Sequence, residues 1–121
     1  MKVSGVFVTI ASRNFDKIVT FYDRLFGRSP ISKIPDKYAE FELNGLKLAI
    51  FKPKTSNREE FDGAAGSGLS LCVEVENLEE SIARLVALGY PPPGEVTVAS
   101  HGREIYAYDP DGNRLILYES N

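Results

Sequence analysis

The 121-residue sequence has a single cysteine, Cys72, and a single histidine, His101. One cysteine cannot form a disulfide within the chain, and a reducing cytoplasm is the expected location. No stretch approaches the roughly 20 apolar residues that span a membrane, and the N-terminus lacks the pattern of a signal peptide. The basic residues are scattered, with no Lys/Arg cluster beside stacking aromatics. The sequence therefore predicts that neither a membrane nor a nucleic acid is a partner.

The composition is that of a soluble globular protein. Hydrophobic residues make up 43% of the chain and charged residues 26%, and the net charge is −3. A chain of this length forms one domain with a core of ordinary size.

The clearest local signal is a β-hairpin near the C-terminus. Residues 109–112 read Asp-Pro-Asp-Gly, where Asp111 can hydrogen-bond its own backbone and Gly112 takes a left-handed conformation without steric cost. Aromatic and branched residues form runs of strand length on both sides, at 105–108 and 115–118. A weaker copy of this pattern, strand, Asn-Gly turn and strand, occupies residues 38–51.

The first half begins with a β-branched and aromatic run, Val3–Ile10, which predicts a strand. Apolar residues at helical spacing predict a helix over Phe15–Phe26, with Asn14 as its N-cap and Gly27 as its stop. A short irregular strand is expected within residues 28–37, and a long polar, glycine-rich loop at 52–68.

The second half repeats this order. Leu69–Val75 is expected to be a strand, Asn77 to cap a helix with Glu80 at the capping-box position, and Gly89 to end that helix. A strand at Glu95–Ala99 precedes the final hairpin.

Spacing supports an internal duplication. The caps Asn14 and Asn77 lie 63 residues apart, and the turn glycines Gly45 and Gly112 lie 67 apart. One βαβββ unit is therefore repeated with few insertions. The predicted fold class is α+β, a single domain of two tandem βαβββ modules: residues 1–52 and 68–121, joined by a linker at about 53–67.

This order resembles that of the vicinal oxygen chelate superfamily, which includes glyoxalases, bleomycin-resistance proteins and extradiol dioxygenases. The resemblance covers nearly the whole chain and is carried by Phe-Tyr at 21–22, Leu-Phe-Gly at 25–27 and Asp-Pro-Asp-Gly-Asn-Arg-Leu at 109–115. It implies modules that each curl a sheet into a half-barrel, pair within or between chains, and bind a ligand in the cleft.

Enzymes of this superfamily hold a divalent metal with His and Glu side chains facing the cleft. The resemblance maps these positions to Phe7 and Ala49 in the first module and to Ser70 and Ile116 in the second. Metals need imidazole, carboxylate or thiolate donors, and only Ser70 offers even a weak oxygen. The sequence therefore predicts no metal site, no catalytic residue and no cofactor.

Strand alternation extends the expected cleft. Residues two apart share a face, so Phe51 joins Ala49. A two-residue turn at Asn44-Gly45 places Tyr38 opposite Phe51 and Glu40 opposite Ala49. The expected ligand-binding residues are Phe7, Thr9, Tyr38, Glu40, Ala49, Phe51, Ser70, Cys72, His101, Arg103, Ile116 and Tyr118.

Several of these residues have a plainer interpretation. His101 fits a surface histidine as well as a contact at the mouth of the cleft, and Cys72 fits a buried inert thiol. Glu40 fits a solvated strand residue as well as an acidic partner for a cationic ligand. Arg103 and Glu104 fit a cross-strand pair.

Two functions follow. The favoured one is a metal-free small-molecule binding protein, like the bleomycin-resistance proteins, that sequesters an aromatic or cationic compound. The alternative is an enzyme, a lyase, isomerase or dioxygenase, with a metal elsewhere or with acid-base groups such as His101, Glu40 and Tyr118. A domain with a closed cleft that only binds a partner is a third possibility. Pairing with a second copy would cover an open apolar face, so a homodimer is expected.

Overall fold

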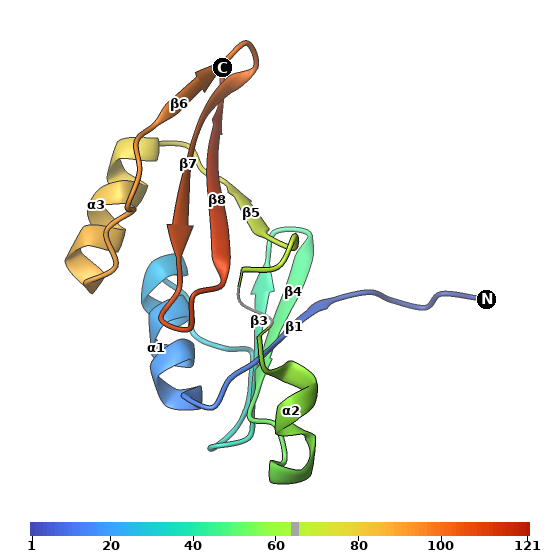
Figure 1. Ribbon diagram of the computed structural model, residues 1–121. Helices are drawn as coiled ribbons and strands as arrows, with labels where there is room; N and C mark the ends of the chain where they lie inside the picture. Colours follow the sequence, from blue (N-terminus) through green and yellow to red (C-terminus); the bar gives the residue numbers. More distant parts are fainter. Residues whose placement is uncertain (64–65) are drawn as a thin grey trace. The chain divides into compact units, whose positions relative to one another are not determined.

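The computed structural model describes residues 1–63 and 66–121 and divides into two compact units, Met1–Asp62 and Gly63–Asn121. The boundary falls within the segment expected to link the two modules. Each unit contains a long helix and a four-stranded mixed sheet (Figure 1).

The first unit has the strand order β1-β4-β3-β2, in which β1 and β4 are parallel and the other neighbours antiparallel. Its elements are β1 (Val8–Ala11), α1 (Phe15–Phe26), β2 (Ser32–Ile34), β3 (Tyr38–Leu43), β4 (Leu46–Phe51), the 3-10 helix η1 (Thr55–Asn57) and α2 (Arg58–Phe61).

The second unit repeats this topology, with the order β5-β8-β7-β6 and a parallel β5–β8 pair. Its elements are β5 (Leu71–Glu74), α3 (Leu78–Leu88), β6 (Thr97–Ala99), β7 (Gly102–Tyr108) and β8 (Arg114–Ser120). The predicted fold, α+β with two βαβββ modules, is confirmed.

Local predictions were confirmed where the turn or helix chemistry was strong. Helix α1 has the predicted bounds, and the Asn44-Gly45 turn pairs Leu43 with Leu46 as expected. Two predictions were wrong. Residues 3–7 lie outside the first strand, and the supposed loop at 52–68 contains η1 and α2; residues 64 and 65 of that loop lie outside the described residues.

The helix caps also differ from each other. Asn77 Oδ1 accepts a hydrogen bond from the Glu80 N–H at 3.0 Å, as predicted. Asn14 makes no capping hydrogen bond with its side chain; its own N–H instead donates to Ser12 Oγ at 3.0 Å. The same residue type therefore caps α3 directly, whereas the entry to α1 is held by the residue two positions earlier.

One face of each sheet is covered by the helix of its own unit. In the first unit the buried side chains on this side include residues of α1 and of alternate positions of β3 and β4: Phe15, Ile18, Val19, Tyr22, Ala39, Phe41, Leu48 and Ile50. In the second they are Leu78, Leu85, Ile105, Ala107, Leu115 and Leu117. Among the described residues, no helix is both long and apolar enough to cross a membrane.

Candidate functional site

The sheet face that points away from α1, termed the first open face, carries five of the expected site residues. Backbone pairing sets Thr9 beside Ala49 and Ala49 beside Glu40. The next row sets Phe51 beside Tyr38. The structure therefore brings these five residues together, with the Tyr38–Phe51 and Glu40–Ala49 pairs in the predicted register.

Two polar side chains of the first open face, Tyr38 and Glu40, bond to each other. The Tyr38 hydroxyl donates to Glu40 Oε1 at 2.9 Å. Desolvation and this bond raise the pKa of Tyr38, because both disfavour the phenolate. The ring of Phe51 meets that of Phe61 edge to face at 5.2 Å, and Ala49 is fully buried. This face is aromatic, with its best-placed acid already hydrogen-bonded.

The second open face points away from α3 and consists of three rows across β5, β8 and β7. Ser70 and Tyr108 flank Arg114 in the first row. The middle row is Cys72, Ile116 and Tyr106, and the last row is Glu74, Tyr118 and Glu104. Cationic, apolar and acidic side chains thus follow one another along the strands.

Cys72 is exposed on this face, so its interpretation as a buried thiol was wrong. Partial desolvation, followed by the carboxylates of Glu104 and Glu74, raises the pKa of its thiol. A raised pKa keeps the thiol protonated at neutral pH, which disfavours a nucleophilic role.

His101 lies at the end of the same face, in the turn before β7. Its carbonyl accepts a hydrogen bond from the Tyr118 hydroxyl at 2.9 Å, and the two rings are 5.6 Å apart. The Tyr118 ring passes over Gly102, where a Cβ would lie 2.9 Å from Cε1 of the tyrosine. The missing side chain of Gly102 therefore makes room for this ring.

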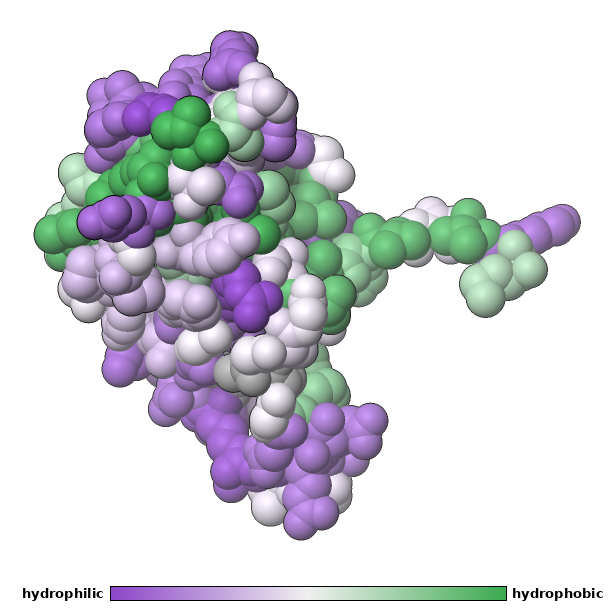
Figure 2. Space-filling model, turned by 45° about the horizontal axis from the view of Figure 1, so that its top comes forward, coloured by the Kyte–Doolittle hydropathy of each residue, from purple (hydrophilic) through white to green (hydrophobic). Residues whose placement is uncertain are grey.

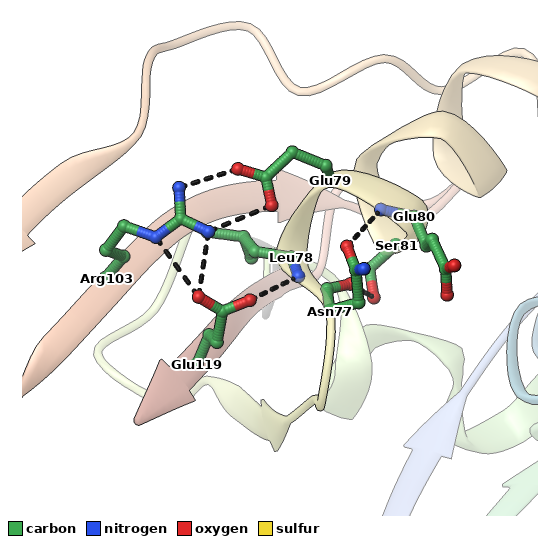
Figure 3. A network of polar contacts seen from close by, with 7 residues as sticks. All are labelled: Asn77, Leu78, Glu79, Glu80, Ser81, Arg103 and Glu119. Carbon is green, nitrogen blue, oxygen red and sulfur yellow. Dashed lines mark hydrogen bonds and ion pairs between the residues drawn. The ribbon is translucent and has the colours of Figure 1, made fainter. Parts of the chain in front are cut away.

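Arg103 is the one expected site residue of the second unit that the structure places elsewhere. It lies on the helix side of the sheet and binds Glu119 Oε1 at 2.8 Å and Glu79 Oε1 at 2.6 Å (Figure 3). Glu119 Oε2 in turn accepts from the Leu78 N–H at 2.8 Å, at the start of α3. The expected pair with Glu104 does not form, because neighbours on a strand point to opposite faces. Arg103 holds α3 to the sheet.

The positions that carry metal ligands in related enzymes do not fit a metal ion. Phe7, Ala49 and Ile116 have no donor atom, and Ser70 Oγ is 3.1 Å from Nη1 of Arg114. A guanidinium at that distance would repel a cation. Among the described residues, no three His, Cys, Asp or Glu side chains are grouped so that they could hold a metal.

The expected ligand-binding residues did not include four residues of the second open face: Glu74, Glu104, Tyr106 and Arg114. Alternation from Cys72 to Glu74 and from Ile116 to Arg114 was available as a signal. Glu104 and Tyr106 needed the register of the final hairpin, whose connection between the paired Tyr108 and Arg114 is longer than a two-residue turn.

Two βαβββ modules, each with an open sheet face of aromatic and polar side chains, define the class of protein. The profile of the Glyoxalase/Bleomycin resistance protein/Dioxygenase superfamily matches residues 6–117. The chain belongs to this superfamily.

Individual relatives agree with this assignment. The chain is 29% identical over 119 residues to the metallothiol transferase FosB of Shouchella clausii, covering 96% of this chain and 80% of the relative. It also matches a protein of Agrobacterium tumefaciens solved by NMR in solution, with 28% identity, 95% of each chain covered and a TM-score of 0.77.

A more distant neighbour shows the fold alone. A glyoxalase/bleomycin resistance protein/dioxygenase family enzyme from Burkholderia phytofirmans has a TM-score of 0.81 at 14% identity, with 95% of this chain and 97% of the other covered.

Proposed function

We propose that this protein binds a small organic compound, aromatic or cationic, on its open sheet faces without the aid of a metal ion. The observation that carries the proposal is the second open face. There Tyr106 is 50% exposed, beside a row in which Tyr118 lies between Glu74 and Glu104. Exposed aromatic rings next to carboxylates favour flat or positively charged ligands.

Stacking and charge supply the binding energy in this proposal. An aromatic pair contributes about 0.5–1.5 kcal/mol beyond the burial of its surface, and a cation over a tyrosine ring about 0.5–2 kcal/mol. Such terms sequester a compound without changing it. A cytoplasmic protein of this kind would protect a cell from a toxic compound, as resistance proteins do.

The competing function is a metal-dependent transfer reaction, which the name of the relative metallothiol transferase FosB suggests. The side chains at the four mapped metal-ligand positions argue against this reaction in this chain. Three of the four mapped positions carry Phe, Ala and Ile, and the fourth, Ser70, is hydrogen-bonded to Arg114. These residues therefore do not support a metal-dependent step.

Native mass spectrometry and elemental analysis of protein purified without added metal test the proposal. We expect no stoichiometric divalent metal and no shift in melting temperature with Zn²⁺, Ni²⁺ or Mn²⁺. A co-purified small organic mass would support binding. Stoichiometric metal, or a melting shift of several degrees that a chelator abolishes, would establish the enzyme function instead.

We also propose that the working form is a homodimer. Large apolar side chains remain exposed on the N-terminal segment and on edge strands, including Val6, Ile34 and Val98. Figure 2 shows the N-terminal segment extending from the rest of the chain with apolar side chains on its surface. Pairing with a second copy would remove such surface from water.

A further inference from the structure

The second open face is polarised along its strands. Arg114 lies in its first row, Ile116 and Tyr106 in its middle row, and Glu74 and Glu104 in its last row. We propose that this face binds an elongated zwitterion with an apolar or aromatic middle. Its anionic group would lie on Arg114 and its cationic group between the two glutamates. The inference rests on the proposed binding function and specifies the chemistry of the ligand.

The anionic group meets a guanidinium that is held in place. Nη1 of Arg114 donates to the Ser67 carbonyl oxygen at 3.0 Å and to Ser70 Oγ at 3.1 Å. Within the described part of the chain, Nη2 and Nε of Arg114 form no hydrogen bond. A guanidinium with two free donors can bind a carboxylate through two parallel hydrogen bonds.

The cationic group meets two carboxylates and a ring. Backbone pairing puts Tyr118 directly between Glu74 and Glu104. Neither glutamate forms an ion pair with any residue that the structure describes. The hydroxyl of Tyr118 is bonded to the His101 carbonyl, which fixes the ring. An ammonium above this row would gain attraction from both carboxylates and from the ring face.

The length of the face sets the length of the ligand. Arg114 and Tyr118 are four residues apart on β8, about 13 Å at the rise of a strand. An extended peptide covers about 3.3–3.6 Å per residue, so opposite charges at the ends of three or four residues match this distance. Tyr106 and Ile116 lie between and offer apolar contact to the middle of such a molecule.

The first open face lacks this separation of charge. There the register sets Lys47 directly beside Glu42, and Glu40 accepts the hydroxyl of Tyr38. Opposite charges in adjacent positions largely cancel, so they produce no separation of positive and negative charge along the strands. The charge complementarity to an elongated zwitterion is therefore a property of the second unit.

The test uses the tetrapeptide Gly-Tyr-Phe-Gly in four forms: free, N-acetylated, C-amidated and blocked at both ends. Binding is followed by calorimetry and by ¹H–¹⁵N spectra of the full-length protein. We expect the free form to bind at least tenfold more tightly than either singly blocked form. The perturbed amides should map to β5, β7 and β8.

Variants locate each charge. Arg114→Met should make C-amidation irrelevant while leaving the effect of N-acetylation, and Glu74→Gln with Glu104→Gln should do the reverse. Lys33→Met in the first unit and Glu80→Gln on α3, both at exposed positions off this face, are the matched controls and should bind like the wild type. Unchanged ¹H–¹⁵N spectra away from the substituted residues show that each variant is folded.

Equal binding of the free and fully blocked peptides would overturn the inference and leave the proposed function standing, since an aromatic ligand would still bind. Absence of binding by every form up to millimolar concentration would also overturn it. The proposed function fails separately, through stoichiometric metal in the purified protein.

Discussion

At the scale of single residues, Gly102 is a position that has no room for a side chain. A Cβ there would collide with the Glu119 carbonyl oxygen on the paired strand and lie 2.9 Å from the Tyr118 ring. We expect Gly102→Ala to lower the free energy of unfolding by about 3 kcal/mol, because backbone atoms of a paired strand cannot move aside. A melting curve should show a decrease of roughly 10 °C.

The matched control is Gly94→Ala in the same unit, where an added Cβ meets nothing within 4 Å. Its melting temperature should stay close to that of the wild type. Equal stability of the two variants would show that β7 and β8 can move apart at Gly102 and accommodate the methyl group.

Asp109 supports a second prediction. It is 97% buried, and its Oδ1 accepts hydrogen bonds from the N–H groups of Asp111 and Asn113 at 2.9 Å. Its Oδ2 accepts from Asn113 Nδ2. Asp109→Ala leaves these donors without their acceptor, and we expect a loss of about 2–3 kcal/mol in urea unfolding.

Asp109→Asn separates the contribution of the two bonds to Oδ1 from that of the bond to Oδ2. The amide oxygen can still accept from the two backbone N–H groups, whereas its NH₂ cannot accept from Asn113. We expect a loss of about 1 kcal/mol. If Asn costs as much as Ala, the charge of Asp109 matters more than its geometry.

The sequence predicted the structural role of a residue correctly where that role depends on its neighbours along the chain. The turn at 109–112 and the cap at Asn77 follow from side-chain reach along the chain. It failed where a role depends on a partner far away in sequence. Nothing near Arg103 indicates that it binds Glu79 and Glu119, and the turn's hydrogen bonds centre on Asp109, whereas Asp111 was expected.

At the scale of elements, α3 is attached to its sheet by charged groups as well as by its apolar side. The N–H of Leu78 and the guanidinium of Arg103 both bind Glu119, and Arg103 also binds Glu79. The backbone N–H and then Arg103 lower the pKa of Glu119, and Arg103 lowers that of Glu79. The folded state therefore binds fewer protons here than the unfolded state.

This difference fixes the sign of the pH dependence. Stability from the cluster is fully present above the ordinary glutamate pKa of about 4.3 and is lost as the pH falls through the lowered values in the folded state. Glu119→Gln keeps an oxygen that can accept from Leu78 N–H but removes one titrating group. Its deficit in melting temperature relative to the wild type should be largest at pH 7 and should shrink below pH 4. A deficit that is constant from pH 7 to pH 3 would contradict this account.

The sequence also predicted the boundaries of an element only where nearby residues set them. Helical periodicity and Gly27 set the bounds of α1, and the Asn-Gly turn set the register of β3 and β4. Val3 to Phe7 have strand propensity but form no strand, and the pairing of β1 with β4 begins at Val8 and Leu48. Propensity cannot show where the pairing between two strands begins.

At the scale of the whole molecule, the exposed N-terminal segment allows the proposed dimer to be tested. Val6 is 83% exposed and lies outside every helix and strand, so Val6→Ser should leave the fold of the first unit intact. If a second copy covers this segment, a buried valine becomes a serine, and the dimer dissociation constant should rise about tenfold or more.

Val86→Ser is the matched control, an exposed valine on α3 with 54% exposure. Sedimentation velocity over a range of concentrations measures both variants. A wild type that sediments as a monomer at every concentration would refute the homodimer. A dimer equally stable in both variants would show that the two copies pair through other surfaces.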